Sequence, residues 1–172
     1  MKNKKAIEDI YSLSSLQSGL LFQHLYTPES DAYFIQNIFE IKGRIDPATL
    51  KQAWEKASYH HPILRTGIVW QDGQEPAQYV LEIAEVPFKL EEWKELSDEE
   101  REEKLKNFIQ EDRKKKFDLK KAPLFRIVLI HYAPDRYFLI WSQHHILLDG
   151  WSASIIFEDV VKAYEGIRQN QA

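Results

Sequence analysis

Residues 124–143 contain two apolar segments on either side of a short turn, and they predict a central pair of strands. The segments Leu124–Tyr132 and Arg136–Gln143 are rich in β-branched and aromatic residues, and Ala133-Pro134-Asp135 between them is typical of a turn. Strands this apolar need other layers to cover them, and helical segments elsewhere in the sequence can supply those layers.

Helix-type and strand-type segments are interspersed along the rest of the chain. Asp46-Pro47 is a strong helix start, and Ser97 with Glu100 has the form of a capping box. The other predicted helices are 13–26, capped by Ser14 or Ser15, and a closing helix in which Ile156, Val160, Ala163 and Ile167 align. Further strands are predicted at 31–43, 63–70 and 78–83, with a turn at 71–74 and a long charged helix from Ser97 to about Lys116. This pattern predicts an α/β fold with a mixed sheet covered by helices.

Charge and composition argue against several classes of protein. The formal net charge is −4 and the basic runs are short, so nothing in the sequence indicates a nucleic-acid binder. The chain has no cysteine, which excludes disulfides, thiolate metal sites and cysteine nucleophiles and suits a reducing cytoplasm, where we expect this protein. No apolar stretch approaches the ~20 residues of a membrane span, and the first residues lack an apolar signal core.

The segment QHHILLDGWS at 143–152 is the sharpest candidate for chemistry, because polar groups there follow a rigid strand. Strand geometry places His144 and His145 on opposite faces, which argues against one metal taking both, so we expect no metal site here. An acid/base role needs one well-placed imidazole. Asp149 can orient it or anchor the loop through a cation, and Gly150 permits close backbone approach or a positive φ.

A structural interpretation of the same residues stays open: a strand that ends in two packed histidines, followed by an Asp-Gly turn.

The sequence does not support other classes of reaction. The sequence has no Gly-x-Ser-x-Gly elbow and no phosphate-binding glycine loop. Ser152 lies near His145 in sequence, but an N-cap position is a sufficient structural role for it.

Three stretches resemble the condensation domains of nonribosomal peptide synthetases, in the order in which that family has them. HHILLDG at 144–150 resembles the HHxxxDG signature that condensation domains share with acyltransferases like chloramphenicol acetyltransferase. YSLSSLQSGLLF at 11–22 is similar to the opening motif, and HHPILRT at 60–66 is similar to the second motif. The resemblance implies a lobe with the chloramphenicol-acetyltransferase-like α/β sandwich fold.

The resemblance also implies a reaction and a role for each signature residue. A donor acyl thioester on one carrier domain is attacked by the amine of an acceptor on a second carrier, and an amide forms. His145 is implied as the base or positioning group, and Gly150 as a backbone N–H donor to the oxyanion. His144 and Asp149 are implied to be structural. The chain itself needs no cofactor, since phosphopantetheine comes with the carrier domains.

The second motif departs from the family at its first position, where His60 replaces the usual arginine. That arginine is thought to steady the signature loop by pairing with its aspartate, here Asp149. His60 can do this only when protonated, and Arg65 or Arg126 are the other candidates. The sequence leaves the partner of Asp149 open.

The length of the chain also departs from the family, because the motifs of a second lobe are absent. We therefore expect residues 11–172 to be an N-terminal lobe that lacks its C-terminal lobe and is inactive when isolated. Residues 1–10 are expected to be a linker, or a docking segment for an upstream synthetase subunit with Lys2, Lys4, Lys5, Ile7 and Ile10 as contacts. Two alternatives remain: a lobe of an epimerisation domain, or a non-catalytic lobe that only docks carrier proteins.

Overall fold

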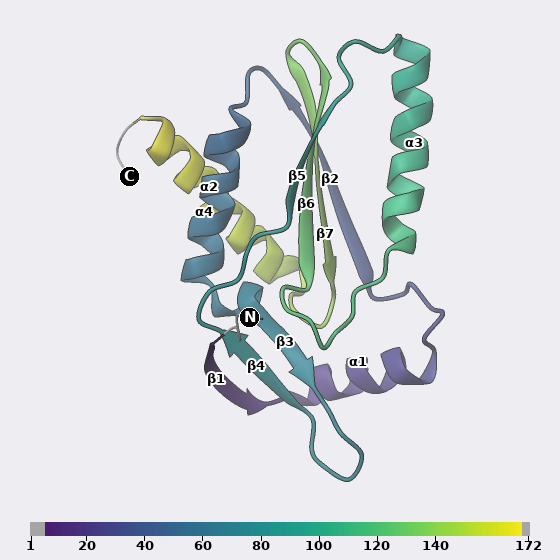
Figure 1. Ribbon diagram of the computed structural model, residues 1–172, viewed down its shortest axis with the longest axis vertical. Coiled ribbons are helices and arrows are strands. Elements are labelled where there is room, and N and C mark those ends of the chain that lie inside the picture. Colours follow the sequence, from purple (N-terminus) through teal and green to yellow (C-terminus); the bar gives the residue numbers. More distant parts are fainter. Residues whose placement is uncertain (1–5, 170–172) are drawn as a thin grey trace, which may run out of the picture.

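The computed structural model describes residues 6–169 of the chain, which form two sheets and four α-helices (Figure 1). In chain order the elements are β1 (Ile7–Ser12), α1 (Ser15–Tyr26), β2 (Phe34–Lys42), α2 (Pro47–His60), the 3₁₀ helix η1 (Pro62–Arg65), β3 (Thr66–Val69), β4 (Ala77–Leu81), β5 (Phe88–Glu92), α3 (Asp98–Lys114), β6 (Phe125–Ala133), β7 (Arg136–His144) and α4 (Gly150–Arg168).

The larger sheet has four strands in the order β2-β7-β6-β5. The predicted pair β6–β7 is confirmed as an antiparallel hairpin, and β2 pairs antiparallel with the other edge of β7. Strand β5, which the sequence analysis missed, pairs parallel with β6. One parallel and two antiparallel pairings make the sheet mixed, as expected.

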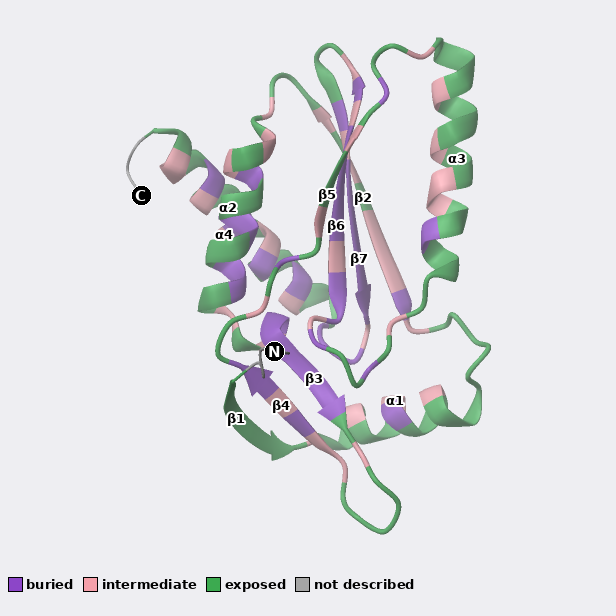
Figure 2. Ribbon diagram, viewed as in Figure 1, coloured by how far each residue is buried: buried purple, intermediate pink, exposed green. Residues whose placement is uncertain are grey.

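Each face of this sheet is covered by different helices, because successive side chains of a strand point to opposite faces (Figure 1). Alternate positions of the central hairpin join a core shared with α2 and α4, which includes Ile127, Leu129, Leu139, Trp141, Trp54 and Ile156. The intervening positions pack with Trp93 and partly buried residues of α3, in a second core that includes Val128, Ile130, Ile140, Leu105 and Phe108. Most residues of the central strands β6 and β7 are buried, as Figure 2 shows.

The structure confirms most predicted helix starts, including which side chain caps each helix. Ser14, and not Ser15, caps α1 and forms a capping box with Gln17. Asp46 caps α2, with Pro47 at the first helical position, and Ser97 forms the expected capping box with Glu100 at the start of α3. These signals are local, so no tertiary contact is needed to place them.

The smaller sheet has the order β1-β4-β3 and lies with α1 at one end of the larger sheet (Figure 1). The predicted turn at 71–74 joins β3 to β4, and Gly73 adopts a φ of 78° there. The predicted strand at 63–70 is only half correct. Pro62 lacks an N–H and has a fixed φ, and it opens the 3₁₀ turn of η1, so the strand begins at Thr66.

The expected boundary near residue 10 also changes. Residues 7–10, expected to be a linker or docking segment, are part of β1 and pair with β4. Lys2, Lys4 and Lys5 lie outside the described residues. Among residues 6–169, none of the helices combines the length and the apolar character that spanning a bilayer requires.

Candidate active site

The HHILLDG segment forms a tight connection between β7 and α4. Strand β7 ends at His144, whose carbonyl accepts a hydrogen bond from Leu147 N–H at 3.1 Å. The next residue, His145, is held to the loop before β2 because its N–H donates to the Tyr33 carbonyl at 2.8 Å. Asp149 then caps α4. The backbone around His145 is therefore fixed by hydrogen bonds before the helix begins.

The His145 ring is oriented by the loop that follows it. Its Nδ1 lies 2.8 Å from the Leu148 carbonyl oxygen. A carbonyl only accepts hydrogen bonds, so Nδ1 carries the proton and its N–H donates a hydrogen bond to the Leu148 carbonyl oxygen. In the neutral ring this leaves a lone pair on Nε2. The loop thus holds the imidazole in the tautomer that can accept a proton or a hydrogen bond at Nε2.

His145 lines a groove of about 570 Å³ between one face of the larger sheet and α4. Its walls come from β2, β7, the signature loop and α4: Ile35, Asn37, Phe39, Trp141, Gln143, Leu148, Asp149, Gly150, Ala153, Ser154, Phe157 and Glu158. Two polar atoms of this wall, Trp141 Nε1 and Gln143 Oε1, are buried and have no hydrogen-bond partner within residues 6–169. Buried polar atoms usually have a partner, so these two mark positions for water or a bound polar group.

His144 lies on the opposite side of β7, as strand geometry predicted, and is buried. Its Nδ1 accepts a hydrogen bond from Ile146 N–H at 3.1 Å, and its ring meets His24 edge-on at 5.3 Å. Burial, with smaller contributions from His24 and His145, lowers the pKa of His144 to about 4. The ring is therefore neutral near pH 7, and its contacts are those of a structural residue.

Gln17 of the opening motif supports the signature loop from α1, a contact that the sequence analysis missed. Its Nε2 donates to the Ile146 carbonyl at 3.3 Å and to Gln78 Oε1 at 3.2 Å. Its Oε1 accepts from Ser14 N–H, so one side chain caps its own helix and reaches the loop. Its place in the opening motif was a signal that Gln17 matters, but it carried no information on this partner.

Asp149 is exposed and serves as the N-cap of α4, which corrects the expectation of an anchoring cation. Its Oδ1 accepts from Ser152 N–H at 2.7 Å. Hydrogen bonds from the Ser152 backbone and side chain hold the pKa of Asp149 below its usual value, and nearby His145 adds to the effect. Ser152 was expected to be the N-cap, but it is the third residue of the helix and donates to the cap instead.

Replacing Asp149 with alanine is expected to lower the melting temperature by roughly 2–4 °C, because the first turn of α4 loses its cap. Asp149→Asn keeps a capping oxygen and is expected to melt close to the wild type. Thermal denaturation of both variants at pH 7 checks this. Equal losses in the two variants would show that the charge of Asp149, and not its capping bond, stabilises the loop.

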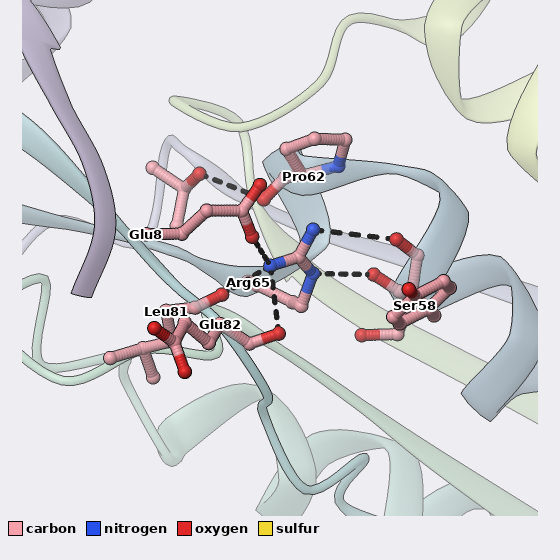
Figure 3. Close-up of polar contacts among 8 residues, drawn as sticks. Glu8, Ser58, Pro62, Arg65, Leu81 and Glu82 are labelled. Carbon is pink, nitrogen blue, oxygen red and sulfur yellow. Dashed lines mark hydrogen bonds and ion pairs between the residues drawn. The ribbon is translucent and has the colours of Figure 1, made fainter. Parts of the chain in front are cut away.

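Arg65, one of the three candidate cations for Asp149, is buried elsewhere and clamps the N-terminal strand (Figure 3). Its Nη1 donates to Glu8 Oε2 at 2.5 Å and to the carbonyls of Leu81 and Glu82, and its Nε donates to the Ser58 carbonyl at 2.9 Å. The guanidinium therefore joins β1, the end of β4 and the end of α2.

The other two candidate cations also have different positions. Arg126 Nε donates to Asp112 Oδ1 at 2.7 Å, which ties β6 to α3. His60 ends α2, and its ring meets that of His61 edge-on at 4.9 Å. Within residues 6–169, Asp149 forms no ion pair with His60, Arg65 or Arg126, so the expected pairing is corrected for all three.

Gly150 is the first residue of α4 and lines the groove. Of the two possibilities that a glycine allows here, a positive φ does not occur, since only Gly43 and Gly73 adopt one among the described glycines, and close backbone approach to a ligand remains. A Cβ added at Gly150 would meet nothing within 4 Å. Its N–H belongs to the first turn of α4, where backbone donors are unsatisfied by the helix and the helix dipole favours negative charge.

The family model for the condensation domain matches residues 7–172. A linear gramicidin synthase subunit of Brevibacillus parabrevis is 38% identical over 171 residues, and a plipastatin synthase subunit of Bacillus subtilis (strain 168) is 35% identical over 171 residues. Each alignment covers 99% of this chain, but only 2% and 7% of the two relatives.

Solved structures confirm the fold. The starter condensation domain of rhizomide synthetase matches with a TM-score of 0.84 at 21% identity, over 96% of this chain and 41% of that one. A four-domain nonribosomal peptide synthetase bound to AMP and glycine matches with a TM-score of 0.78 at 23% identity, over 92% of this chain and 12% of that one. At these identities the likeness concerns the fold alone. With the family model matching nearly its whole length, the chain belongs to the condensation domain family of nonribosomal peptide synthetases.

Proposed function

We propose that this chain is the N-terminal lobe of a condensation domain that joins a carrier-bound donor acyl thioester to a carrier-bound acceptor amine. The observation that carries the proposal is the orientation of His145, whose Nδ1 is bound by the Leu148 carbonyl and whose ring lines the groove beside α4. The match to about two fifths of a solved condensation domain supports the assignment to one lobe. A groove wall of this kind needs a C-terminal lobe opposite it to become a channel.

In the proposed reaction His145 acts on the acceptor amine. The amine reacts as the neutral form, after its ammonium proton has gone to solvent. The Nε2 lone pair accepts a hydrogen bond from this amine, which either only orients it or lets His145 take the proton that the nitrogen loses as it attacks. The amine nitrogen then attacks the thioester carbonyl carbon, and the carbonyl oxygen becomes an oxyanion. When the C–S bond breaks, the amide forms and the thiolate recovers a proton. His145, as the imidazolium, can supply that proton, so the ring ends the cycle neutral.

Gly150 is the proposed donor to the oxyanion. Its N–H lies at the N-terminus of α4, where the helix dipole favours developing negative charge. The remaining signature residues hold this arrangement. His144 fills the far side of β7 as a neutral ring, and Asp149 fixes the start of the helix.

The proposed partners follow from the two carrier-bound substrates. Donor and acceptor carrier domains bring phosphopantetheine with them, so the chain needs no cofactor of its own. We place the reaction in the cytoplasm, in antibiotic-type secondary metabolism.

The first residues are proposed to dock an upstream synthetase subunit. Residues 7 and 8 belong to β1, so the deletion that tests this docking should remove only residues 1–5, with product transfer from the upstream subunit as the measurement.

Amide formation by the chain alone and with a C-terminal lobe supplied separately tests the proposal. We expect no product from the chain alone and product from the reassembled domain. If the reassembled domain instead inverts the donor stereocentre without forming an amide, the chain is a lobe of an epimerisation domain. If it binds carrier domains without any turnover, the chain is a docking lobe. Robust amide formation by the chain alone would contradict the single-lobe assignment.

Gly150→Ala distinguishes two contributions of this residue in the complete domain. The variant is expected to fold like the wild type, because the added Cβ meets no atom and the φ is ordinary. It also retains the backbone N–H. A loss of kcat with an unchanged melting temperature would show that substrate approaches the Cα within van der Waals contact. Unchanged kinetics would leave the N–H as the only contribution of Gly150 to the site.

A further inference from the structure

Three potential metal ligands from two helices meet outside the groove. His60 ends α2, His61 is its C-cap, and Asp159 lies in the middle of α4. One ligand atom from each lies within 4.8 Å of the others. His61 Nε2 and Asp159 Oδ2 are already 2.9 Å apart.

The end of α2 explains how two consecutive histidines can converge. Along a strand such neighbours point to opposite faces, which separates His144 from His145. Here the helix stops between the two residues: His61 leaves the helical conformation with φ −106° and ψ 99°. The change of backbone direction turns the His61 ring toward that of His60, and the ring centroids are 4.9 Å apart.

The donor set matches a borderline divalent cation such as Zn²⁺. Two imidazole nitrogens and one carboxylate oxygen are common zinc ligands, and a fourth tetrahedral position remains for water. Zinc bonds of about 2.0–2.1 Å place neighbouring ligand atoms about 3.3 Å apart. His60 is exposed, so its ring can rotate to shorten the present spacing.

One neighbouring cation bears on the site. Lys162 Nζ lies 3.9 Å from Asp159 Oδ1, on the oxygen that does not contact His61. Lys162 also pairs with Glu158 at 2.8 Å and is largely exposed. Its ammonium can therefore remain with Glu158 when a metal occupies the other oxygen of Asp159.

We propose that His60, His61 and Asp159 form a binding site for a zinc-class divalent cation that links the C-terminal end of α2 to α4. The bound ion replaces the His61–Asp159 hydrogen bond with two stronger bonds and adds His60 as a third protein ligand. Its effect is to stabilise the helical layer that covers the larger sheet. The site uses none of the residues assigned to the proposed amide-forming reaction, so either proposal can fail without the other.

Titration of the metal-free chain with Zn²⁺ at pH 7, followed by calorimetry, tests the site. We expect one ion per chain. At a free Zn²⁺ concentration a hundredfold above Kd, the melting temperature should rise by roughly 5 °C or more. His60→Gln and Asp159→Asn should each weaken binding at least about tenfold, since even residues that only support metal ligands contribute about that much. Co²⁺ should give the absorption bands of a tetrahedral site in the wild type and lose them in both variants.

His131 provides the matched control. Its Nδ1 lies 2.9 Å from Glu92 Oε2, the same type of histidine–carboxylate pair, but it is not part of a three-ligand group in residues 6–169. His131→Gln should leave the affinity and the stoichiometry unchanged. Absence of Zn²⁺ binding by the wild type, or binding that persists in His60→Gln and Asp159→Asn, would overturn the proposal. Melting curves without metal should show all variants folded, because His60 is exposed and Asp159 is partly so.

Discussion

His145→Ala, placed in a complete condensation domain that carries this lobe, is expected to lower kcat for amide formation by about 10²–10⁴-fold. The variant removes the imidazole that lines the groove and whose tautomer is set by the bond from Nδ1 to the Leu148 carbonyl. Folding should be retained, since His145 is only partly buried and its backbone bond to Tyr33 does not depend on the side chain. Single-turnover amide formation from preloaded carrier domains measures the loss.

Two further variants separate the chemical role of His145 from a positioning role. His145→Gln can still accept a hydrogen bond from the amine but cannot take its proton near pH 7. Substantial recovery in this variant relative to His145→Ala would identify orientation as the main contribution, whereas equal losses would identify proton transfer. His131→Gln, which lies outside the groove, should keep wild-type turnover. Near-wild-type turnover of His145→Ala on most substrate pairs would remove the role assigned to it.

Arg65→Met is expected to lower the free energy of unfolding by on the order of 3 kcal/mol. The guanidinium is buried and donates to several backbone carbonyls as well as to Glu8 (Figure 3). Methionine fills much of the same volume but leaves those carbonyls without a donor. The loss should appear in urea denaturation as a lower midpoint with an unchanged slope.

Two controls show whether this loss comes from the buried carbonyls. Glu8→Gln should cost much less, because Glu8 is about half exposed and a glutamine can still accept from Arg65. Arg136→Met removes an arginine from an exposed ion pair with Glu40 and should cost less than about 1 kcal/mol. If Arg65→Met were as mild as Arg136→Met, the clamp would not hold β1 in place.

Local chemistry made much of this fold predictable. The caps at Ser14, Asp46 and Ser97 depend on residues three positions away, and the β6–β7 hairpin depends on two apolar segments and the turn between them. The separation of His144 from His145 follows from the period of two in a strand. The candidate catalytic histidine was therefore accessible from the sequence, together with the family to which the chain belongs.

Contacts between distant segments were decided only by the tertiary structure. Strand β5 is short and has no strong alternation, and it becomes a strand because the edge of β6 offers it backbone partners. Arg65 could not be assigned to Glu8 and the end of β4 from its place in a motif, nor Gln17 to the carbonyl of Ile146. The approach of His60 and His61 to Asp159 depends on how α2 packs against α4. Residue type and spacing specify interactions within a few residues, whereas partners far apart in the chain are chosen by the packing of the whole lobe.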